Sequence, residues 1–156
     1  MIRSAEPRDI PEILALIKEL ADYEKAPDEA KATEQQLRDA LFSQDPKVFC
    51  EMVEVDGQIL GFAIWFLNFS TWQGKHGIYL EDLYIRPQYR GQGWGKRLLQ
   101  HLAAKCIAND WGRFQWWVLD WNEPSIEFYK ALGAVPMDEW TIYRVSGDAL
   151  AKLAGN

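Results

Sequence analysis

The sequence predicts a single domain over residues 1–156 of mixed α/β (α+β) class, with a central, mostly antiparallel sheet of six to seven strands and helices on both faces. Apolar residues alternate in some segments and recur every three to four positions in others, so strands and helices both occur. The predicted order βααβββαβαβ contains too few parallel crossovers for a doubly wound sheet. The 156 residues, 48% of them hydrophobic and 26% charged, are enough for one compact core.

In the first half of the chain, residues 2–5 predict a short strand. A helix follows, whose apolar residues recur at helical spacing: Ile10, Ile13, Leu14, Ile17 and Leu20. Thr33 and Gln36 form a potential capping box at the start of a second helix. Segments 48–55 and 58–68 predict a hairpin, because Asp56-Gly57 between them is a strong turn signal.

The second half of the chain predicts alternating strands and helices. Pro87 closes the first of these strands, Pro124 begins a short helix, and Gly133 is a natural residue to end that helix. The expected elements are a strand, a helix, a strand, a helix, a strand and a helix, over 77–85, 94–109, 113–121, 124–133, 141–145 and 147–153.

Composition narrows the classes of function. The net charge of −6 argues against a nucleic-acid surface and leaves room for a small cationic substrate. No apolar run is long enough for a membrane span, and the N-terminus lacks the apolar region of a signal peptide. Cys50 and Cys106 are isolated, which favours buried reduced thiols in a cytoplasmic protein. His76 and His101 are also isolated, so no metal is expected.

A glycine-rich segment carries the first chemical signal. Gly91, Gly93 and Gly95 follow a predicted strand and open a predicted helix. Glycine allows backbone N–H groups to approach a ligand, and a helix N-terminus presents unpaired donors and a positive dipole end. Arg90 and Lys96 add positive charge. This segment is therefore suited to bind a pyrophosphate.

Spacing separates three types of phosphate-binding loop. A P-loop requires GxxxxGK followed by Ser or Thr, and the interval from Gly91 to Gly95 is one residue too short. A dinucleotide-binding fingerprint requires GxGxxG, whereas this segment reads GxGxG. The pattern Arg90-x-x-Gly93-x-Gly95 instead resembles the coenzyme A pyrophosphate loop of the GNAT acetyltransferases.

The resemblance extends over nearly the whole chain. Residues 79–85 (YLEDLYI), 89–91 (YRG) and 120–130 (DWNEPSIEFYK) are similar to the diamine and thialysine acetyltransferase branch of that superfamily. It implies a GNAT fold with a slot between the splayed fourth and fifth strands, acetyl-CoA as co-substrate, and a homodimer. By the same resemblance, the residues expected to bind acetyl-CoA are Leu83, Tyr84, Ile85, Arg90, Gly91, Gln92, Gly93, Trp94, Gly95, Lys96, Asn122, Pro124, Ser125 and Tyr129.

The resemblance also assigns catalytic roles. Tyr129 is expected to protonate the coenzyme A thiolate, and Glu81 to act as the base through a water molecule. A carboxylate within an apolar strand is uncommon, which supports a function for Glu81 independently. Asp82 follows directly, so strand alternation predicts that it faces the other side of the sheet and cannot pair with Glu81. A structural hydrogen-bond acceptor is the favoured interpretation of Asp82.

Residues Tyr23, Glu24 and Trp72 are the expected contacts for the substrate amine. Acidic residues near 22–29 are also typical of a solvated helix end, but the resemblance favours a substrate contact for Tyr23 and Glu24. Polyamine enzymes carry Asp-Pro where this chain has Ser70-Thr71, so the sequence argues against long polyamines.

The expected reaction is acetyl transfer from acetyl-CoA to a primary amine of a small cationic metabolite, either a diamine or polyamine or an amino acid of lysine or thialysine shape. Direct attack in a ternary complex is favoured, because neither cysteine lies in a recognisable nucleophile setting. Two alternatives remain open: a protein acetyltransferase acting on a lysine or N-terminal amine, and a non-catalytic regulatory domain that binds coenzyme A.

Overall fold

The computed structural model describes residues 1–156 in two compact units, residues 1–119 and 120–156. The first unit contains β1 (Ile2–Ser4), α1 (Ile10–Tyr23), α2 (Glu34–Leu41), β2 (Phe49–Val55), β3 (Gln58–Ser70), β4 (Lys75–Ile85), α3 (Trp94–Ala108) and β5 (Arg113–Trp116). Three short 3-10 turns accompany them: η1 (Pro7–Asp9), η2 (Pro27–Glu29) and η3 (Pro87–Tyr89). The second unit contains α4 (Glu123–Ala131) and α5 (Gly147–Leu153).

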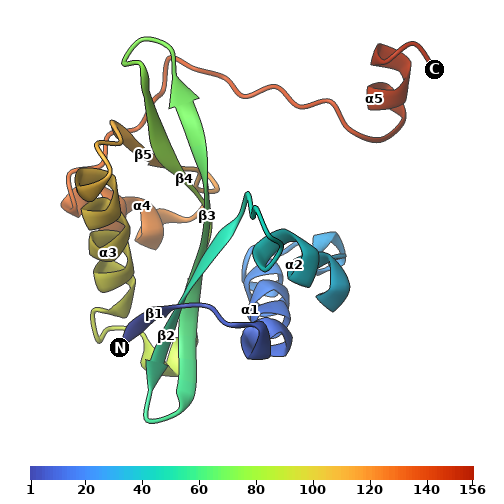
Figure 1. The fold of residues 1–156 in the computed structure, drawn as a ribbon. Helices are drawn as coiled ribbons and strands as arrows, with labels where there is room; N and C mark the ends of the chain where they lie inside the picture. The colour runs from blue at the N-terminus through green and yellow to red at the C-terminus, as the bar shows by residue number, and fades with distance from the viewer. The chain divides into compact units, whose positions relative to one another are not determined.

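A five-stranded mixed sheet forms the centre of the first unit, in the order β1-β2-β3-β4-β5 (Figure 1). Every pair is antiparallel except β4–β5, which is parallel. The predicted mixed, mostly antiparallel sheet is confirmed. It contains five strands, whereas six to seven were expected. The predicted strand over 113–121 ends at Trp116, and residues 141–145 form no strand. Residues that favour strands form one only where a neighbouring strand pairs with them, and a single segment does not reveal its neighbour.

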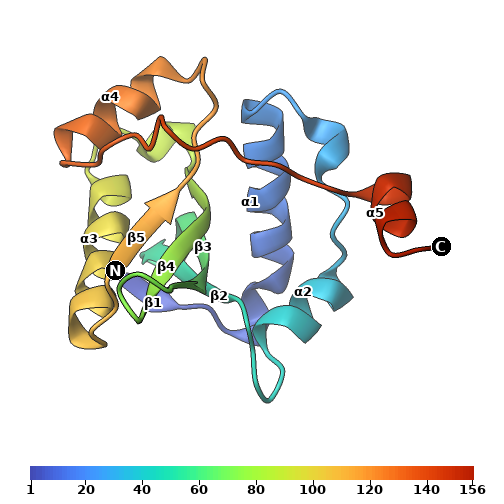
Figure 2. The same cartoon turned by 90° about the horizontal axis from the view of Figure 1, so that it is seen from above.

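Helices cover both faces of this sheet, as predicted. In Figure 2, α1 and α2 lie on one side of the strands and α3 lies on the other. The core beneath α1 contains Ile13, Leu16, Leu20, Leu41, Cys50, Met52, Phe62, Ile64 and Tyr84. Beneath α3, buried side chains of the helix face buried residues of β4: Leu98, Leu99, Leu102 and Cys106 against Ile78 and Leu80. No helix is both long and apolar enough to cross a bilayer.

Local sequence signals for helix starts and turns are confirmed. The Thr33 hydroxyl accepts from the Gln36 amide at 3.2 Å, and the Gln36 side chain accepts from the Thr33 amide at 3.0 Å. This is the reciprocal capping box predicted for α2. Asp56 and Gly57 adopt φ values of 51° and 76°, which a two-residue hairpin turn of the primed type requires.

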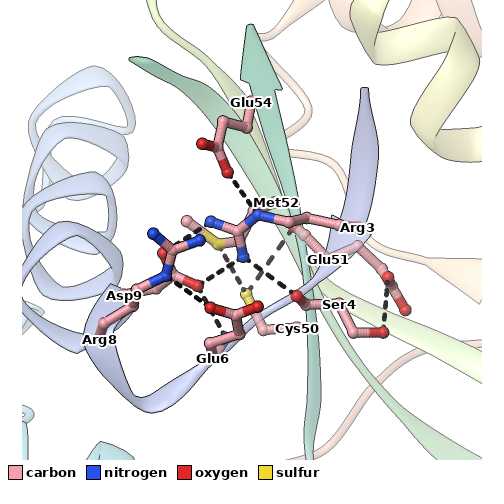
Figure 3. A network of polar contacts seen from close by, with 9 residues as sticks. All are labelled: Arg3, Ser4, Glu6, Arg8, Asp9, Cys50, Glu51, Met52 and Glu54. Carbon is pink, nitrogen blue, oxygen red and sulfur yellow. Dashed lines mark hydrogen bonds and ion pairs between the residues drawn. The ribbon is translucent and has the colours of Figure 1, made fainter. Parts of the chain in front are cut away.

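A partly buried ionic network ties β1 to the start of α1 and to β2 (Figure 3). The Arg3 guanidinium donates to both oxygens of Asp9, at 2.8 and 2.9 Å, and also to Glu54. The Glu6 amide donates to Asp9 at 2.7 Å. Burial alone raises the pKa of Asp9, but these bonds outweigh burial and the pKa is lowered. The network therefore fixes α1 against the sheet with an ionised carboxylate.

Candidate functional site

The glycine-rich loop has the backbone geometry of an anion site. Gly91 and Gly93 have φ values of 77° and 83°, in the left-handed region that favours glycine, and Gly93 is the N-cap of α3. Arg97 makes the first helical bond, from its amide to the Gly93 carbonyl at 3.0 Å. The N–H groups of residues 94–96 precede it and have no acceptor within the helix. Such amides can bind an anion such as a pyrophosphate, as the sequence predicts.

Next to the loop, β4 has an open backbone edge. Strand β5 pairs with β4 only from Gly77 to Leu80, whereas β4 continues to Ile85. On this edge Leu83, Tyr84 and Ile85 face no strand, although β3 pairs with them on the other edge. The predicted divergence of these two strands is therefore confirmed. It leaves backbone groups that suit the amides of a pantetheine arm.

The register between β3 and β4 shifts by one residue in the middle of the ladder. Trp65 lies opposite Leu80, but the neighbouring Ile64 lies opposite Asp82. Glu81 is therefore an extra residue on β4, which makes a β-bulge. Such bulges redirect side chains and interrupt the regular alternation of a strand.

The bulge places both carboxylates on the face covered by α1. Trp65 faces α3, because the Lys105 ammonium lies 5.9 Å from its ring, whereas Ile64 belongs to the core beneath α1. Directly opposed residues share a face, so Asp82 lies on the α1 side with Ile64. Leu80 lies opposite Trp65 and therefore shares its α3 side. Successive residues of a strand point to opposite faces, so the next residue, Glu81, points to the α1 side. The prediction that the two carboxylates face opposite sides was wrong, because a bulge breaks the alternation on which it depended.

Electrostatics single out Asp82, which sequence reasoning treated as structural. Burial, then the charges of Glu81 and Glu24, raise the pKa of Asp82 to about 7. Burial and the charge of Glu81 also raise the pKa of Glu24. Within residues 1–119, no lysine or arginine forms an ion pair with these three carboxylates. Such an arrangement attracts an ammonium group and can accept its proton.

The C-terminal end of α1 holds Glu24 in place. Glu24 is the C-cap, and Lys25 follows in the left-handed region with φ 61°. The amides of Lys25 and Ala26 donate to the Asp22 and Ala21 carbonyls at 3.1 and 2.9 Å, which is a Schellman motif. The motif therefore fixes the backbone at Glu24, where α1 ends.

Arg90 lies between this helix end and the sheet. Its guanidinium carbon is 5.1 Å from the centre of the Tyr23 ring and 5.3 Å from that of Tyr84. Its Nε donates to the Ile85 carbonyl at 2.8 Å. The side chain therefore joins Tyr23, a predicted substrate residue, to the strand that leads into the glycine loop.

Trp72 lies apart from the carboxylates. It is 86% exposed in the turn between β3 and β4, just before β4 begins at Lys75. Glu81 is six residues further along β4, or about 20 Å at the rise of a strand. The structure of one chain therefore does not bring Trp72 together with Glu24, Glu81 and Asp82. No group of three or more His, Cys, Asp or Glu side chains has the arrangement of a metal site.

In the second unit, the predicted residues share helix α4. Asn122 is the N-cap, and its side-chain oxygen accepts from the Ser125 amide at 3.4 Å. Pro124 occupies the first turn, where a missing N–H is tolerated. Tyr129 is half-buried near the end of the helix, with its ring 5.6 Å from that of Phe128. The sequence Asn-Glu-Pro-Ser therefore starts the helix that carries Tyr129.

Comparisons with known proteins agree with this geometry. Residues 13–134 match the model of the acetyltransferase (GNAT) family. The chain is 38% identical to the thialysine N-epsilon-acetyltransferase of Bos taurus, covering 99% of this chain and 97% of that protein. It is 31% identical to an L-ornithine N5-acetyltransferase of Arabidopsis thaliana, and the match covers 96% of this chain and 85% of that protein. An integron cassette protein from the mobile metagenome of V. cholerae has a similar structure, with a TM-score of 0.83, 29% identity and coverage of 100% and 98%. The chain therefore belongs to the GNAT family of N-acetyltransferases.

Proposed function

We propose that this enzyme transfers the acetyl group of acetyl-CoA to the side-chain amine of a lysine-shaped amino acid, with thialysine or lysine as the preferred acceptor. The observation that carries the proposal is the full-length similarity to thialysine N-epsilon-acetyltransferase. The ornithine-acetylating relative also acts on a basic amino acid. Diamines and polyamines are the second candidate class of acceptor, because of the resemblance in the sequence motifs.

The charges of the site support a small cationic acceptor. Glu24, Glu81 and Asp82 concentrate negative charge beside α1, which favours an ammonium group. Long polyamines carry further ammonium groups that require further carboxylates. Ser70 and Thr71 provide none where polyamine enzymes have an aspartate, so a short acceptor is favoured.

The glycine loop and its surroundings are proposed to hold acetyl-CoA. Backbone amides of residues 91–96 bind the pyrophosphate, with Lys96 adding charge. The open edge of β4 at residues 83–85 is proposed to bind the pantetheine amides. Asn122, Pro124 and Ser125 are proposed as further acetyl-CoA contacts from the family resemblance alone. Bound acetyl-CoA supplies the acetyl group as an activated thioester.

Two sets of residues are proposed to move the protons. The Glu81–Asp82 pair accepts the proton that the acceptor ammonium must lose before its amine can attack, directly or through water. The Tyr129 hydroxyl supplies the proton for the departing thiolate. Transfer is direct in a ternary complex, because Cys50 is buried and burial raises the pKa of its thiol, so it is a poor nucleophile.

We propose that both units form one GNAT domain over residues 1–156. The family match from residue 13 to 134 continues across the boundary between residues 119 and 120, which supports this assignment. Limited proteolysis that released a stable fragment of residues 1–119 would contradict it.

We also propose a homodimer. Residues 134–146 of the second unit form neither helix nor strand, and several apolar side chains there are exposed: Val135, Met137, Ile142, Tyr143 and Val145. Apolar surface of this kind marks an interface more often than a solvated chain. Light scattering should give twice the mass of one chain, and a single-chain mass at all concentrations would contradict the proposal.

A cytoplasmic location is proposed from the cysteines. Cys50 and Cys106 are both free and buried, which is typical of proteins from reducing compartments. Cell fractionation should recover the protein with cytoplasmic markers.

Release of free thiol from acetyl-CoA tests the reaction and the acceptor together. The panel contains thialysine, lysine, ornithine, putrescine, spermidine, a lysine-containing peptide and a sample without amine. We expect the highest kcat/KM with thialysine or lysine. A peptide as the best acceptor would favour a protein acetyltransferase. Binding of coenzyme A without release stimulated by any amine would favour a regulatory domain.

A further inference from the structure

The side chain of Arg90 connects the two halves of the proposed site. It begins the glycine-rich segment, but its guanidinium lies against the Tyr23 ring at 5.1 Å and the Tyr84 ring at 5.3 Å. Its Nε donates to the Ile85 carbonyl at 2.8 Å. Tyr23 is the last residue of α1, and Tyr84 is a buried residue of β4. One cation therefore joins the loop, the strand and the helix end.

These contacts depend on the shape of arginine. A planar guanidinium can lie near two aromatic rings while its Nε–H makes a directed hydrogen bond to a carbonyl. A lysine ammonium keeps the charge but has no Nε–H at that position and no planar group to stack. The side chain thus holds Tyr23 by its geometry as well as by its charge.

The position of Arg90 in the chain makes these contacts sensitive to the ligand of the loop. Gly91 and Gly93 follow with φ values of 77° and 83°, and Gly93 is the N-cap of α3, so Arg90 directly precedes the amides that open the helix. An anion held by the amides of residues 91–96 fixes this backbone and with it the base of the Arg90 side chain. The guanidinium then fixes Tyr23, and with it the next residue, Glu24, whose carboxylate interacts electrostatically with that of Glu81 at the proposed acceptor site.

We propose that Arg90 is a positioning residue that couples coenzyme A binding at the glycine loop to the order of the C-terminal turn of α1. The enzyme consequently binds the acceptor amine tightly only after acetyl-CoA is in place. The inference about the acceptor rests on the proposed function, whereas the coupling between loop and helix does not.

Hydrogen exchange measures the coupling without any acceptor. The reporters are the amides of Glu24, Lys25 and Ala26, which bond to α1 carbonyls and exchange when this turn opens. Saturating coenzyme A should slow their exchange by about five-fold or more in the wild type, the lower end of typical couplings between sites. Amides of residues 91–96 report occupancy of the loop in the same experiment.

Two substitutions of Tyr23 form a matched pair. Tyr23→Phe keeps the ring beside Arg90 and should keep the slowing at residues 24–26. Tyr23→Leu removes the ring and should abolish that slowing, while the loop remains protected by coenzyme A. Equal slowing of amide exchange at residues 24–26 in Tyr23→Leu and in the wild type would overturn the proposal. It would also be overturned if coenzyme A protected the loop amides of the wild type without slowing exchange at residues 24–26.

Acceptor binding provides the second readout. Calorimetry with lysine should show about five-fold or greater tightening by coenzyme A in the wild type and in Tyr23→Phe. The ratio should fall to near one in Arg90→Lys and in Tyr23→Leu. An unchanged ratio in both variants would overturn the coupling. Wild-type enzyme that acetylates none of the amines tested would overturn the proposed function instead, and the exchange experiment would still decide the coupling.

Discussion

Two carboxylates on opposite faces of the same sheet have different surroundings. Glu51 on β2 is 2% exposed beneath α3, and its oxygens lie 3.4–3.5 Å from three donors: Ser4 Oγ, Trp65 Nε1 and Lys105 Nζ. Asp82 on β4 lies on the α1 face, where its charged neighbours are Glu81 and Glu24. Burial with donors stabilises an ionised acid, whereas burial beside like charges favours the protonated form.

The difference is the basis for proposing a structural role for Glu51 and a functional role for Asp82. Glu51 has its hydrogen-bonding partners within the chain, and its role is to hold β1, β3 and α3 together. Asp82 is left without a cation in residues 1–119, and an ammonium ligand would supply the missing partner. An uncompensated carboxylate at a site for a cationic substrate is the pattern expected of a proton acceptor.

The largest expected effect is on catalysis. Asp82→Asn removes the proposed proton acceptor and should lower kcat/KM for the amine by about 100-fold, the lower end of typical general-base contributions. Glu51→Gln is the matched control on the other face and should change kcat/KM by less than about threefold. Steady-state kinetics with saturating acetyl-CoA measure both. Equal losses in the two variants would remove the functional distinction.

For the free energy of unfolding, the order of the two variants should be reversed, with the larger loss in Glu51→Gln. Glu51→Gln leaves Lys105 without its buried anion and should lower the free energy of unfolding by about 2 kcal/mol, a moderate value because Lys105 is about one-third exposed. Asp82→Asn should not lower it at neutral pH. Urea unfolding followed by tryptophan fluorescence measures both values. A loss in Asp82→Asn as large as in Glu51→Gln would show that Asp82 is structural.

The pH dependence of stability sharpens the same contrast. The pKa of Asp82 is raised to about 7, so the folded protein binds more protons than the unfolded chain between about pH 4 and pH 7. Wild-type stability should therefore fall relative to Asp82→Asn as the pH rises through this window, by on the order of 2 kcal/mol after allowance for partial exposure. Unfolding of both proteins at pH 5 and pH 8 tests this, and a constant difference would contradict it.

The smallest expected effect concerns one donor to Glu51. Ser4→Ala removes a hydroxyl that lies 3.4 Å from the carboxylate, a long contact, and should lower the free energy of unfolding by about 0.5 kcal/mol. Two other donors, Trp65 and Lys105, remain to Glu51. A loss above about 2 kcal/mol would mean that the network depends on Ser4 far more than its geometry indicates.

Much of the fold could be predicted because its signals are local. The capping box at Thr33, the turn at Asp56-Gly57 and the glycine loop each depend on a few adjacent residues, and each was predicted. The strand count was not, because a strand requires a partner. The bulge at Glu81 depends on the register of β4 against β3, which no single segment contains. Asp82 was missed for that reason, although two adjacent carboxylates in an apolar strand were a visible signal.

The most direct test of the central claim is the pH profile of kcat/KM for the amine. The wild type should show an ascending limb near pH 7 in addition to the titration of the amine itself. Glu81→Gln should move this limb to lower pH, because it removes a like charge, and Asp82→Asn should abolish it. An unchanged limb in Asp82→Asn would contradict the assignment of Asp82 to the proton-accepting pair.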